Sequence, residues 1–334
     1  MKKSIFLAIA TLFLAVCTTS LGYANTVQQT NTTKPDDTKF TIGIIYHEKF
    51  SWYVSQIEEL VKWTHWDVIV ANQKEFKTQD GVSAEGISKI LERSNIAIIA
   101  THGKYDEENG RHMLMFGDQY VTATAFNDER INVKKDAIIF AAACKTVSGD
   151  TLEEMNEFPL VFINKGASMY FGYNVSVDSL VAYDSFAYYL NALMEGKSIQ
   201  KAKEDRPSKY YLTPDPGIEE IPLFIFPDNK DYRIPRWYFP GFIVGRELMI
   251  ASIKKDDLAL DSALEQFKAD LEFIKSIDSK LGEAYIEDLK KGVKSVLVDE
   301  AVKKGGKIEE KDLNLEKEVN DLVTVFAMLA EHKR

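Results

Sequence analysis

The stretch Ile96-Ala97-Ile98-Ile99-Ala100-Thr101-His102-Gly103 is an apolar run that ends in a histidine and a glycine. A second run, Ala137-Ile138-Ile139-Phe140-Ala141-Ala142-Ala143-Cys144, ends in a cysteine. Continuous apolar runs of this length, bounded by small and polar residues, are typical of buried parallel strands. Ligands of open α/β sheets gather at the carboxyl ends of such strands. If the two strands are neighbours, the imidazole of His102 and the thiol of Cys144 meet at one edge of the sheet.

Each of these two residues also has a purely structural interpretation. A single cysteine at the end of a core strand is often a small buried apolar side chain, and a single histidine is often a hydrogen-bonded polar one. A reactive pair is favoured because His102 and Cys144 occupy the same position at the ends of their strands. An imidazole beside a thiol is a general base with its nucleophile.

The first 24 residues are typical of a secretory signal peptide. They have a charged start, an apolar stretch over residues 5–16 and a small-x-small cleavage site at Gly22-Tyr23-Ala24. The apolar stretch is short for a membrane span. A lipid anchor at Cys17 is less favoured than cleavage, because Val16 is bulky where a small residue is expected. We therefore expect an exported protein, located in a bacterial periplasm, at the cell surface or in the medium.

Removal of the signal peptide leaves Cys144 as the only cysteine. Exported proteins normally pair their cysteines, so a single thiol is worth considering as a reactive group. One cysteine excludes a multi-thiolate zinc site, and the histidines lack metal-ligand spacing. We therefore expect neither a metal nor another cofactor. His112 is the only rival to His102 as base, but it begins a predicted hairpin instead of ending a central strand.

Composition and charge narrow the class of protein further. The chain is 45% hydrophobic and 28% charged, which is typical of globular proteins. It has 51 acidic against 41 basic residues and no basic patch, so nucleic acid is not an expected partner. After the signal peptide no apolar run reaches membrane-spanning length, so we expect no integral membrane segment.

Pattern changes divide the chain into further segments. Residues 25–38 are rich in Thr, Asn and Gln and predict a disordered leader. Strands and helices alternate over residues 39–245, which predicts a mostly parallel sheet with helices on both faces. The expected strands are residues 40–46, 66–71, 96–101, 137–143, 167–173 and 223–226. The expected helices are 51–64, 84–93, 151–156 and 177–194, with a polar loop after His102 and a hairpin over 111–121.

Residues 246–334 predict an α-helical subdomain. Leu260, Leu264 and Phe267 belong to one series of apolar residues at alternating fours and threes, and Leu315 and Val319 begin another. Such spacing produces amphipathic helices. Their apolar faces can pack on the preceding domain, on each other, or on a partner or second copy of the chain, and the sequence leaves these options open.

The order of these features resembles the caspase-like cysteine peptidases of clan CD, and most closely the CHAT and gingipain-like branch. The resemblance is carried by a strand that ends in His102-Gly103, a later strand that ends in Ala143-Cys144, and a Gly-Ala-x-x-x-x-Gly strand at residues 166–172. Residues 186–203 are similar to the helix and turn that follow this strand in the family. The similar region covers roughly residues 40–231.

This resemblance implies a caspase-like three-layer fold and a Cys-His dyad. His102 would act as general base and later as acid toward the leaving amine, and Cys144 would attack the scissile carbonyl to form an acyl-enzyme. In the family the oxyanion is held by main-chain N–H groups, which here are those of Gly103 and Cys144. A side chain at Gly103 would crowd the substrate carbonyl.

The resemblance also implies where specificity resides. The family places its P1 pocket beside the strand after the cysteine strand, which here means Tyr173, Asn174 and Asp178. Members that cleave after Arg or Lys often carry an acidic residue there, so Asp178 is the candidate for a basic P1 preference. The sequence departs from the separase-like pattern at Asn174, where that pattern has an acidic residue. The alternative interpretation is that Asp178 caps the following helix.

These observations predict an exported cysteine endopeptidase that acts on protein or peptide substrates. The alternative is a catalytically silent caspase-fold protein that binds a peptide or partner, with the C-terminal helices as its docking surface. The combination of His102, Gly103 and Cys144 favours the enzyme, because a binding module does not need all three.

Overall fold

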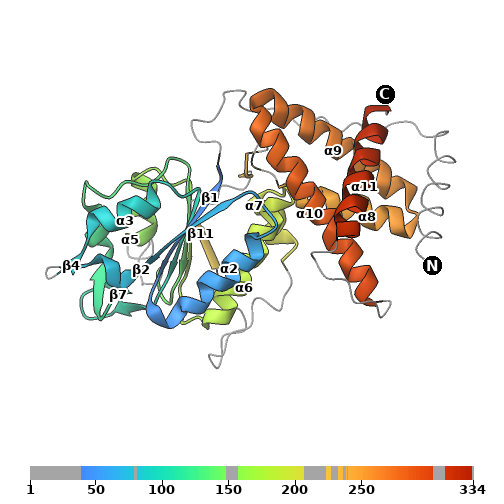
Figure 1. Cartoon of the computed structure of the whole chain (residues 1–334). Helices are drawn as coiled ribbons and strands as arrows, with labels where there is room; N and C mark the ends of the chain where they lie inside the picture. The colour runs from blue at the N-terminus through green and yellow to red at the C-terminus, as the bar shows by residue number, and fades with distance from the viewer. Residues whose placement is uncertain are drawn as a thin grey trace. The chain divides into compact units, whose positions relative to one another are not determined.

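The computed structural model describes residues 39–78, 81–147, 157–206, 223–226, 232–235, 238, 240–303 and 313–332. The expected signal peptide, the leader, Cys17 and the helix expected over residues 151–156 lie outside these residues. The chain divides into two compact units (Figure 1). We refer to residues 39–235 as the sheet unit and to residues 236–334 as the helical unit, and describe each by itself.

The sheet unit is built on a six-stranded, mostly parallel sheet, which confirms the predicted α/β class. The strand order is β11-β10-β9-β5-β1-β2, and only β11 runs antiparallel to its neighbour. The strands are β1 (Thr41–Tyr46), β2 (Asp67–Asn72), β5 (Ile96–Ala100), β9 (Ile138–Ala142), β10 (Met169–Tyr173) and β11 (Leu223–Phe226). All six strands predicted from the sequence are therefore present.

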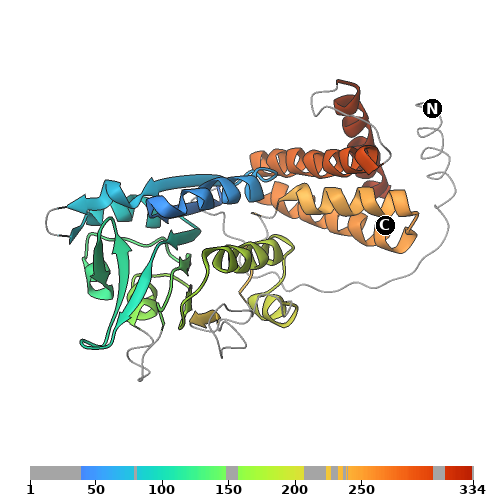
Figure 2. The ribbon, with the colours of Figure 1, turned by 90° about the horizontal axis from the view of Figure 1, so that it is seen from below.

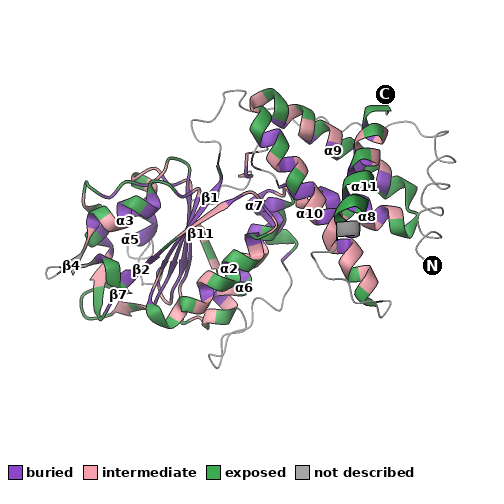
Figure 3. Cartoon of the chain, in the orientation of Figure 1, coloured by how far each residue is buried: buried purple, intermediate pink, exposed green. Residues whose placement is uncertain are grey.

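Helices cover both faces of this sheet (Figure 1). One face carries α2 (Ser51–Val61) and α6 (Ser179–Met194), and the other carries α3 (Ala84–Leu91) and α5 (Glu157–Asn164). Every residue of β5 and β9 is buried (Figure 3), which explains why these strands are apolar without alternation.

Local signals in the sequence set the ends of two of these helices. The Ser83 side chain accepts a hydrogen bond from Gly86 N at the start of α3, and Asp178 caps α6 in the same way. Helix α6 is followed by Gly196 with φ 75°, a left-handed conformation that favours glycine. The short elements are η1 (Glu48–Phe50), η2 (Gln73–Phe76), η3 (Ala123–Asn127), β3 (Lys77–Thr78), β4 (Gly81–Val82) and α7 (Ile199–Glu204).

A second, three-stranded antiparallel sheet follows β5. It contains β6 (Gly103–Asp106), β7 (Arg111–Phe116) and β8 (Gln119–Thr122) in that order. The predicted hairpin is confirmed by β7 and β8, but the prediction of a polar loop after His102 is wrong, because β6 is a strand paired with β7. A polar edge strand in a small sheet has no apolar pattern to reveal it, since main-chain pairing alone defines it.

The helical unit contains α8 (Gly241–Lys254), α9 (Asp257–Ile277), α10 (Ser279–Lys303) and α11 (Leu313–His332). The two predicted series of apolar residues lie on α9 and α11. Their members Leu264, Phe267, Val319 and Phe326 are buried in one core within this unit. The apolar faces of these helices therefore pack on each other.

The boundary between the units falls at residue 235, ten residues earlier than predicted. The residues before Gly245 begin helix α8, and α8 and α10 run alongside each other (Figures 1 and 2). A Cβ at Gly241 would lie 2.1 Å from Tyr285 O, and one at Gly292 would lie 2.2 Å from Phe242 O. Glycines on facing sides of two helices allow this close approach of main chains, and the sequence analysis did not recognise that role.

None of the helices in the described ranges combines the length and the apolar character that crossing a membrane requires.

Candidate active site

The register of β5 and β9 determines how His102 and Cys144 are placed. The two strands pair in parallel, with Ile98 opposite Phe140 and Ala100 opposite Ala142, which confirms the prediction that they are neighbours. Thr101 N also donates to Ala142 O over 3.3 Å, so the pairing continues beyond the strands. His102 and Cys144 each lie two residues beyond this last pair, so they occupy corresponding positions after the two strands.

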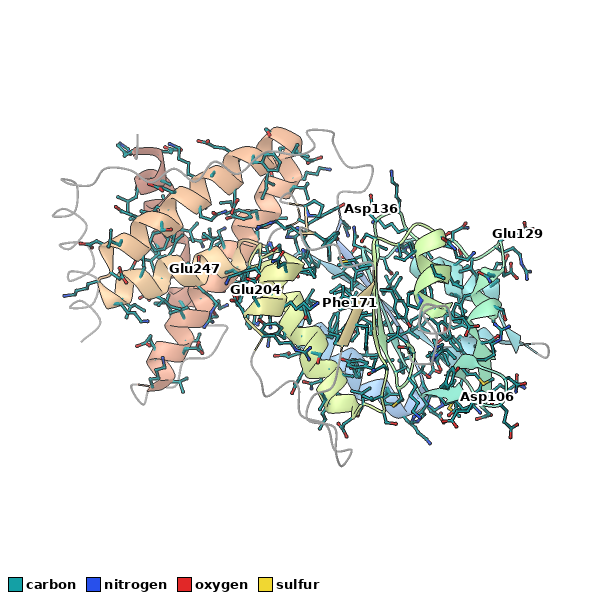
Figure 4. The ribbon with its side chains drawn as sticks, turned by 180° about the vertical axis from the view of Figure 1, so that it is seen from behind. Asp106, Glu129, Asp136, Phe171, Glu204 and Glu247 are labelled. Atoms are coloured by element: carbon teal, nitrogen blue, oxygen red, sulfur yellow. The ribbon has the colours of Figure 1, made fainter. Side chains whose placement is uncertain are left out.

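Both residues lie at the carboxyl edge of the sheet, on the face that α2 and α6 cover. Strand alternation places residues two apart on the same face. The neighbours agree with this, because His102 contacts Phe50 directly before α2, and Cys144 contacts Val177 near the start of α6. In Figure 4 Asp136, which precedes β9, and Asp106, which ends β6, lie toward opposite ends of the unit.

The imidazole of His102 lies between aromatic rings instead of polar partners. Its centroid is 4.9 Å from that of Phe50 and 5.6 Å from that of His47, both in edge-on contact. Its Nε2 atom is buried and has no hydrogen-bond partner among the described residues. Burial lowers the pKa of His102, and electrostatic interactions with His47 and Lys49 lower it further. A lowered pKa keeps the ring neutral, which a general base requires.

His47 is a residue of this site that sequence analysis missed. It is 5% exposed and follows β1, and its Nδ1 accepts from Lys49 N over 3.3 Å. Nε2 must then carry the proton, and it lies 3.2 Å from Gly117 O. The chain order reverses between β1 and β5, the topological switch point at which open α/β sheets bind ligands. That His47 directly follows its strand, much as His102 does, is the signal that could have found it.

The thiol of Cys144 is partly exposed and contacts the main chain of Val177. Sγ accepts a hydrogen bond from Val177 N over 3.3 Å and lies 3.5 Å from Val177 O. Within the described chain no hydrogen bond joins Sγ to His102.

The turn after Cys144 is held by several hydrogen bonds. Lys145 has φ 48°, a left-handed conformation that is unusual for a residue with a long side chain. Its N–H donates to Val175 O over 3.1 Å, and Thr146 N donates to Tyr173 O over 2.8 Å. His112, the rival base of the sequence analysis, is fully buried in β7, and its Nδ1 lies 2.9 Å from Lys145 O.

Gly103 lies against the main chain of Cys144. A Cβ at this position would lie 2.0 Å from Cys144 O, so no other residue fits without displacing the cysteine. Crowding of a substrate carbonyl is the explanation that the sequence suggests for this glycine. In the structure, a side chain at this position would already collide with the main chain of Cys144.

The structure shows how far the two N–H groups predicted to form an oxyanion hole are already engaged in hydrogen bonds within the protein. Met115 N donates to His102 O over 2.8 Å, which makes Gly103 and Leu114 a non-hydrogen-bonded pair of β6 and β7. The N–H of Gly103 therefore points away from β7. The N–H of Cys144 donates to no acceptor in the described part of the chain.

The three predicted specificity residues have different environments. Tyr173 is fully buried, with its ring centroid 6.4 Å from that of Phe140, which argues against direct contact with a substrate. Burial raises its pKa. The Oδ1 atom of Asn174 is buried and has no partner among the described residues. Asp178 is exposed, and its Oδ1 accepts from Leu180 N over 2.8 Å, so the helix-cap interpretation is confirmed.

Comparison of the chain with models of known protein families found no match, and comparison with curated protein sequences found none either. In the described ranges no group of three or more His, Cys, Asp or Glu side chains is arranged to hold a metal ion. The function is therefore inferred from the geometry of the carboxyl edge.

Proposed function

We propose that the sheet unit is a caspase-like cysteine peptidase with Cys144 as nucleophile and His102 as general base. The observation that supports this proposal is the register of β5 and β9, because His102 and Cys144 each follow their strand by two residues and therefore lie on one face at the carboxyl edge of the sheet. The layered arrangement around a mostly parallel sheet accords with the resemblance in sequence. The signal peptide predicted from the sequence adds that the enzyme is exported.

The proposed reaction is hydrolysis of a peptide bond in two steps. The Cys144 thiol gives its proton to His102, and Sγ forms a bond to the scissile carbonyl carbon. The tetrahedral intermediate collapses as the imidazolium protonates the leaving amine and the C–N bond breaks. Water, deprotonated by His102, then cleaves the thioester and releases the acid and the free thiol.

Two features of the edge support this chemistry. The lowered pKa of His102, caused first by burial, makes the neutral base available at and below neutral pH. The main chains of Gly103 and Cys144 are in close contact, and their N–H groups are the proposed donors to the developing oxyanion. The hydrogen bond from Val177 N to Sγ defines the resting position of the thiol, and catalytic contacts are often loose in unliganded enzymes.

A preference for Arg or Lys at P1 is a separate part of the proposal. Asp178 is exposed and caps α6 through Oδ1, so Oδ2 is the atom that a basic side chain would contact. The buried Oδ1 of Asn174 is a second acceptor near the end of β10.

The decisive experiment is covalent labelling of the protein with peptide acyloxymethyl ketones that carry Arg, Lys, Asp or Leu at P1. We expect one adduct per chain, located at Cys144 by peptide mass mapping, and none with Cys144→Ser. Fluorogenic peptides with the same P1 residues should be cleaved by the wild type and by the exposed-histidine control His332→Ala. They should not be cleaved by Cys144→Ser.

The hydrogen bonds between Sγ and Val177 are the observation that favours the alternative, a silent peptide-binding domain. In that case the ketones would react with Cys144 only after denaturation. Binding of the same peptides, measured by calorimetry, would then be equal for the wild type and Cys144→Ser.

A further inference from the structure

His112 is a buried histidine that the proposed chemistry does not use. It is 0% exposed, its main-chain N–H donates to Glu157 Oε2 over 3.1 Å, and its ring lies 4.8 Å from that of Tyr105. Its Nδ1 lies 2.9 Å from the carbonyl oxygen of Lys145. A carbonyl can only accept, so Nδ1 carries a proton and is the donor of this hydrogen bond.

The bond from His112 reaches the residue directly after the candidate nucleophile. Lys145 has the left-handed φ of 48°, which is unfavourable for a residue with a Cβ and persists only where its surroundings hold it. Its N–H is held by Val175 O on one side, and its carbonyl is held by His112 on the other. Both flanking peptide groups of Lys145 are therefore fixed in orientation.

These constraints extend to Cys144. The peptide group between Cys144 and Lys145 directs its N–H to Val175, so its carbonyl points the other way, against Gly103. The direction of the Cys144 main chain follows from this contact, and with it the positions of Sγ and of the Cys144 N–H. A change at Lys145 O would thus move the nucleophile and one of the two proposed oxyanion donors.

His112 itself has no access to a substrate. It is buried, and its proton-bearing nitrogen is engaged with Lys145 O, so it does not fit the role of general base. We propose that His112 is a positioning residue, which holds the turn at Lys145 through its Nδ1–H and thereby orients Cys144. The expected effect on catalysis rests on the proposed function. The expected effect of His112 on the conformation of the turn at Lys145 does not depend on it.

Two substitutions separate the hydrogen bond from the packing of the ring. His112→Phe keeps an aromatic ring but removes the donor, and His112→Asn removes the ring but keeps an N–H at a position close to that of Nδ1. Phe116→Leu is the matched control, because Phe116 is a buried aromatic residue of the same strand whose side chain has no donor for the Lys145 carbonyl. The full chain is used throughout.

We expect His112→Phe to lower kcat for peptide hydrolysis by about tenfold to a hundredfold with KM nearly unchanged, because small displacements of reacting groups have effects of this size. Hydrogen exchange at the Lys145 and Thr146 amides should accelerate relative to the core amides of β9. His112→Asn should retain most of the activity, and hydrogen exchange at the Lys145 and Thr146 amides should stay as slow as in the wild type. Phe116→Leu should lower the melting temperature without either local effect.

The outcomes distinguish this inference from the proposed function. Wild-type-like kcat and turn exchange in a folded His112→Phe protein would overturn the positioning role. Equal losses in the Phe and Asn variants would also overturn it, since packing alone would then explain them. If His112→Phe does not fold, a large loss of kcat in folded His112→Asn has the same meaning. If the wild type cleaves no peptide, the peptidase proposal fails, and the exchange rates still test the turn.

Discussion

The helical unit and the sheet unit differ in whether their buried polar side-chain atoms have hydrogen-bond partners. In the helical unit Asp270 and Asp288 are almost fully buried, and both have partners. Gln266 Nε2 donates to Asp270 Oδ2 over 2.6 Å, and Lys291 Nζ lies 3.1 Å from Asp288 Oδ1. In the described part of this unit every buried side-chain nitrogen and oxygen has a hydrogen-bond partner.

The sheet unit contains buried polar atoms that lack such partners. They include the hydroxyl of Tyr53 in the first turn of α2, Nε2 of His102 and Oδ1 of Asn174. An unsatisfied buried polar group costs about 1–3 kcal/mol, so these positions are not optimised for stability. Within the described residues, the buried side-chain atoms without a hydrogen-bond partner therefore all lie in the sheet unit, and Nε2 of His102 and Oδ1 of Asn174 are among them.

The largest effect is expected at His102. His102→Ala removes the proposed general base, so kcat/KM for peptide cleavage should fall about 10²- to 10⁴-fold. Stability to thermal unfolding should change little, because the ring forms no hydrogen bond to a described residue. The exposed His332→Ala is the control in both assays. A His102→Ala protein that unfolds at a lower temperature but retains its activity would mean that His102 contributes to stability, as the buried polar groups of the helical unit do.

Glycine substitutions compare main-chain contacts in the two units. A Cβ would lie 2.0 Å from Cys144 O at Gly103 and 2.2 Å from Leu289 O at Gly245. Each alanine variant should cost about 1–3 kcal/mol in free energy of unfolding, the usual price of overpacking. Only Gly103→Ala should also slow alkylation of Cys144 by iodoacetamide. Equal alkylation rates in the two variants would show that Gly103 has a structural role alone.

The pH dependence of activity provides a smaller test. The pKa of His102 is lowered by burial and by His47 and Lys49, so the acidic limb of kcat/KM should lie below the ordinary imidazole value of about 6.5. Lys49→Glu should move this limb to higher pH, because a negative charge favours the imidazolium. The control is Lys280→Glu in the helical unit. The same lowered pKa predicts that the native state loses stability as the pH falls below about 6.5, since the unfolded chain then binds the proton more readily.

A limb that does not move with Lys49→Glu would remove His102 as the group that titrates in the rate profile.

The smallest effect is expected at Asp178, where two roles can be separated. Asp178→Ala should cost about 1 kcal/mol through loss of the cap of α6, whereas Asp178→Ser should keep most of the stability. If Asp178 also binds a basic P1 side chain, both variants should lose preference for Arg over Leu at P1, as measured by kcat/KM. An unchanged preference in Asp178→Ser would leave Asp178 as a helix cap only.

Some of the fold could be predicted because the signals are local. Strands β5 and β9 are apolar on both faces, Ser83 caps α3 through its own side chain, and α9 has a regular apolar stripe. The start of helix α8 was not predicted, because glycines such as Gly241 and Gly245 disfavour a helix in the absence of tertiary contacts. Their role becomes visible only where Gly241 and Gly245 meet α10.

The sequence by itself determined that His102 and Cys144 each follow a buried strand, since burial on both faces demands continuous apolar runs. It also determined the helix cap at Asp178, since the cap needs only neighbours in the chain. Only the tertiary structure decided the register of β5 and β9, the burial of Tyr173 and the approach of His47 and His112 to the carboxyl edge. These features depend on contacts between residues far apart in the sequence, and no local pattern encodes which distant strand or carbonyl a side chain will meet.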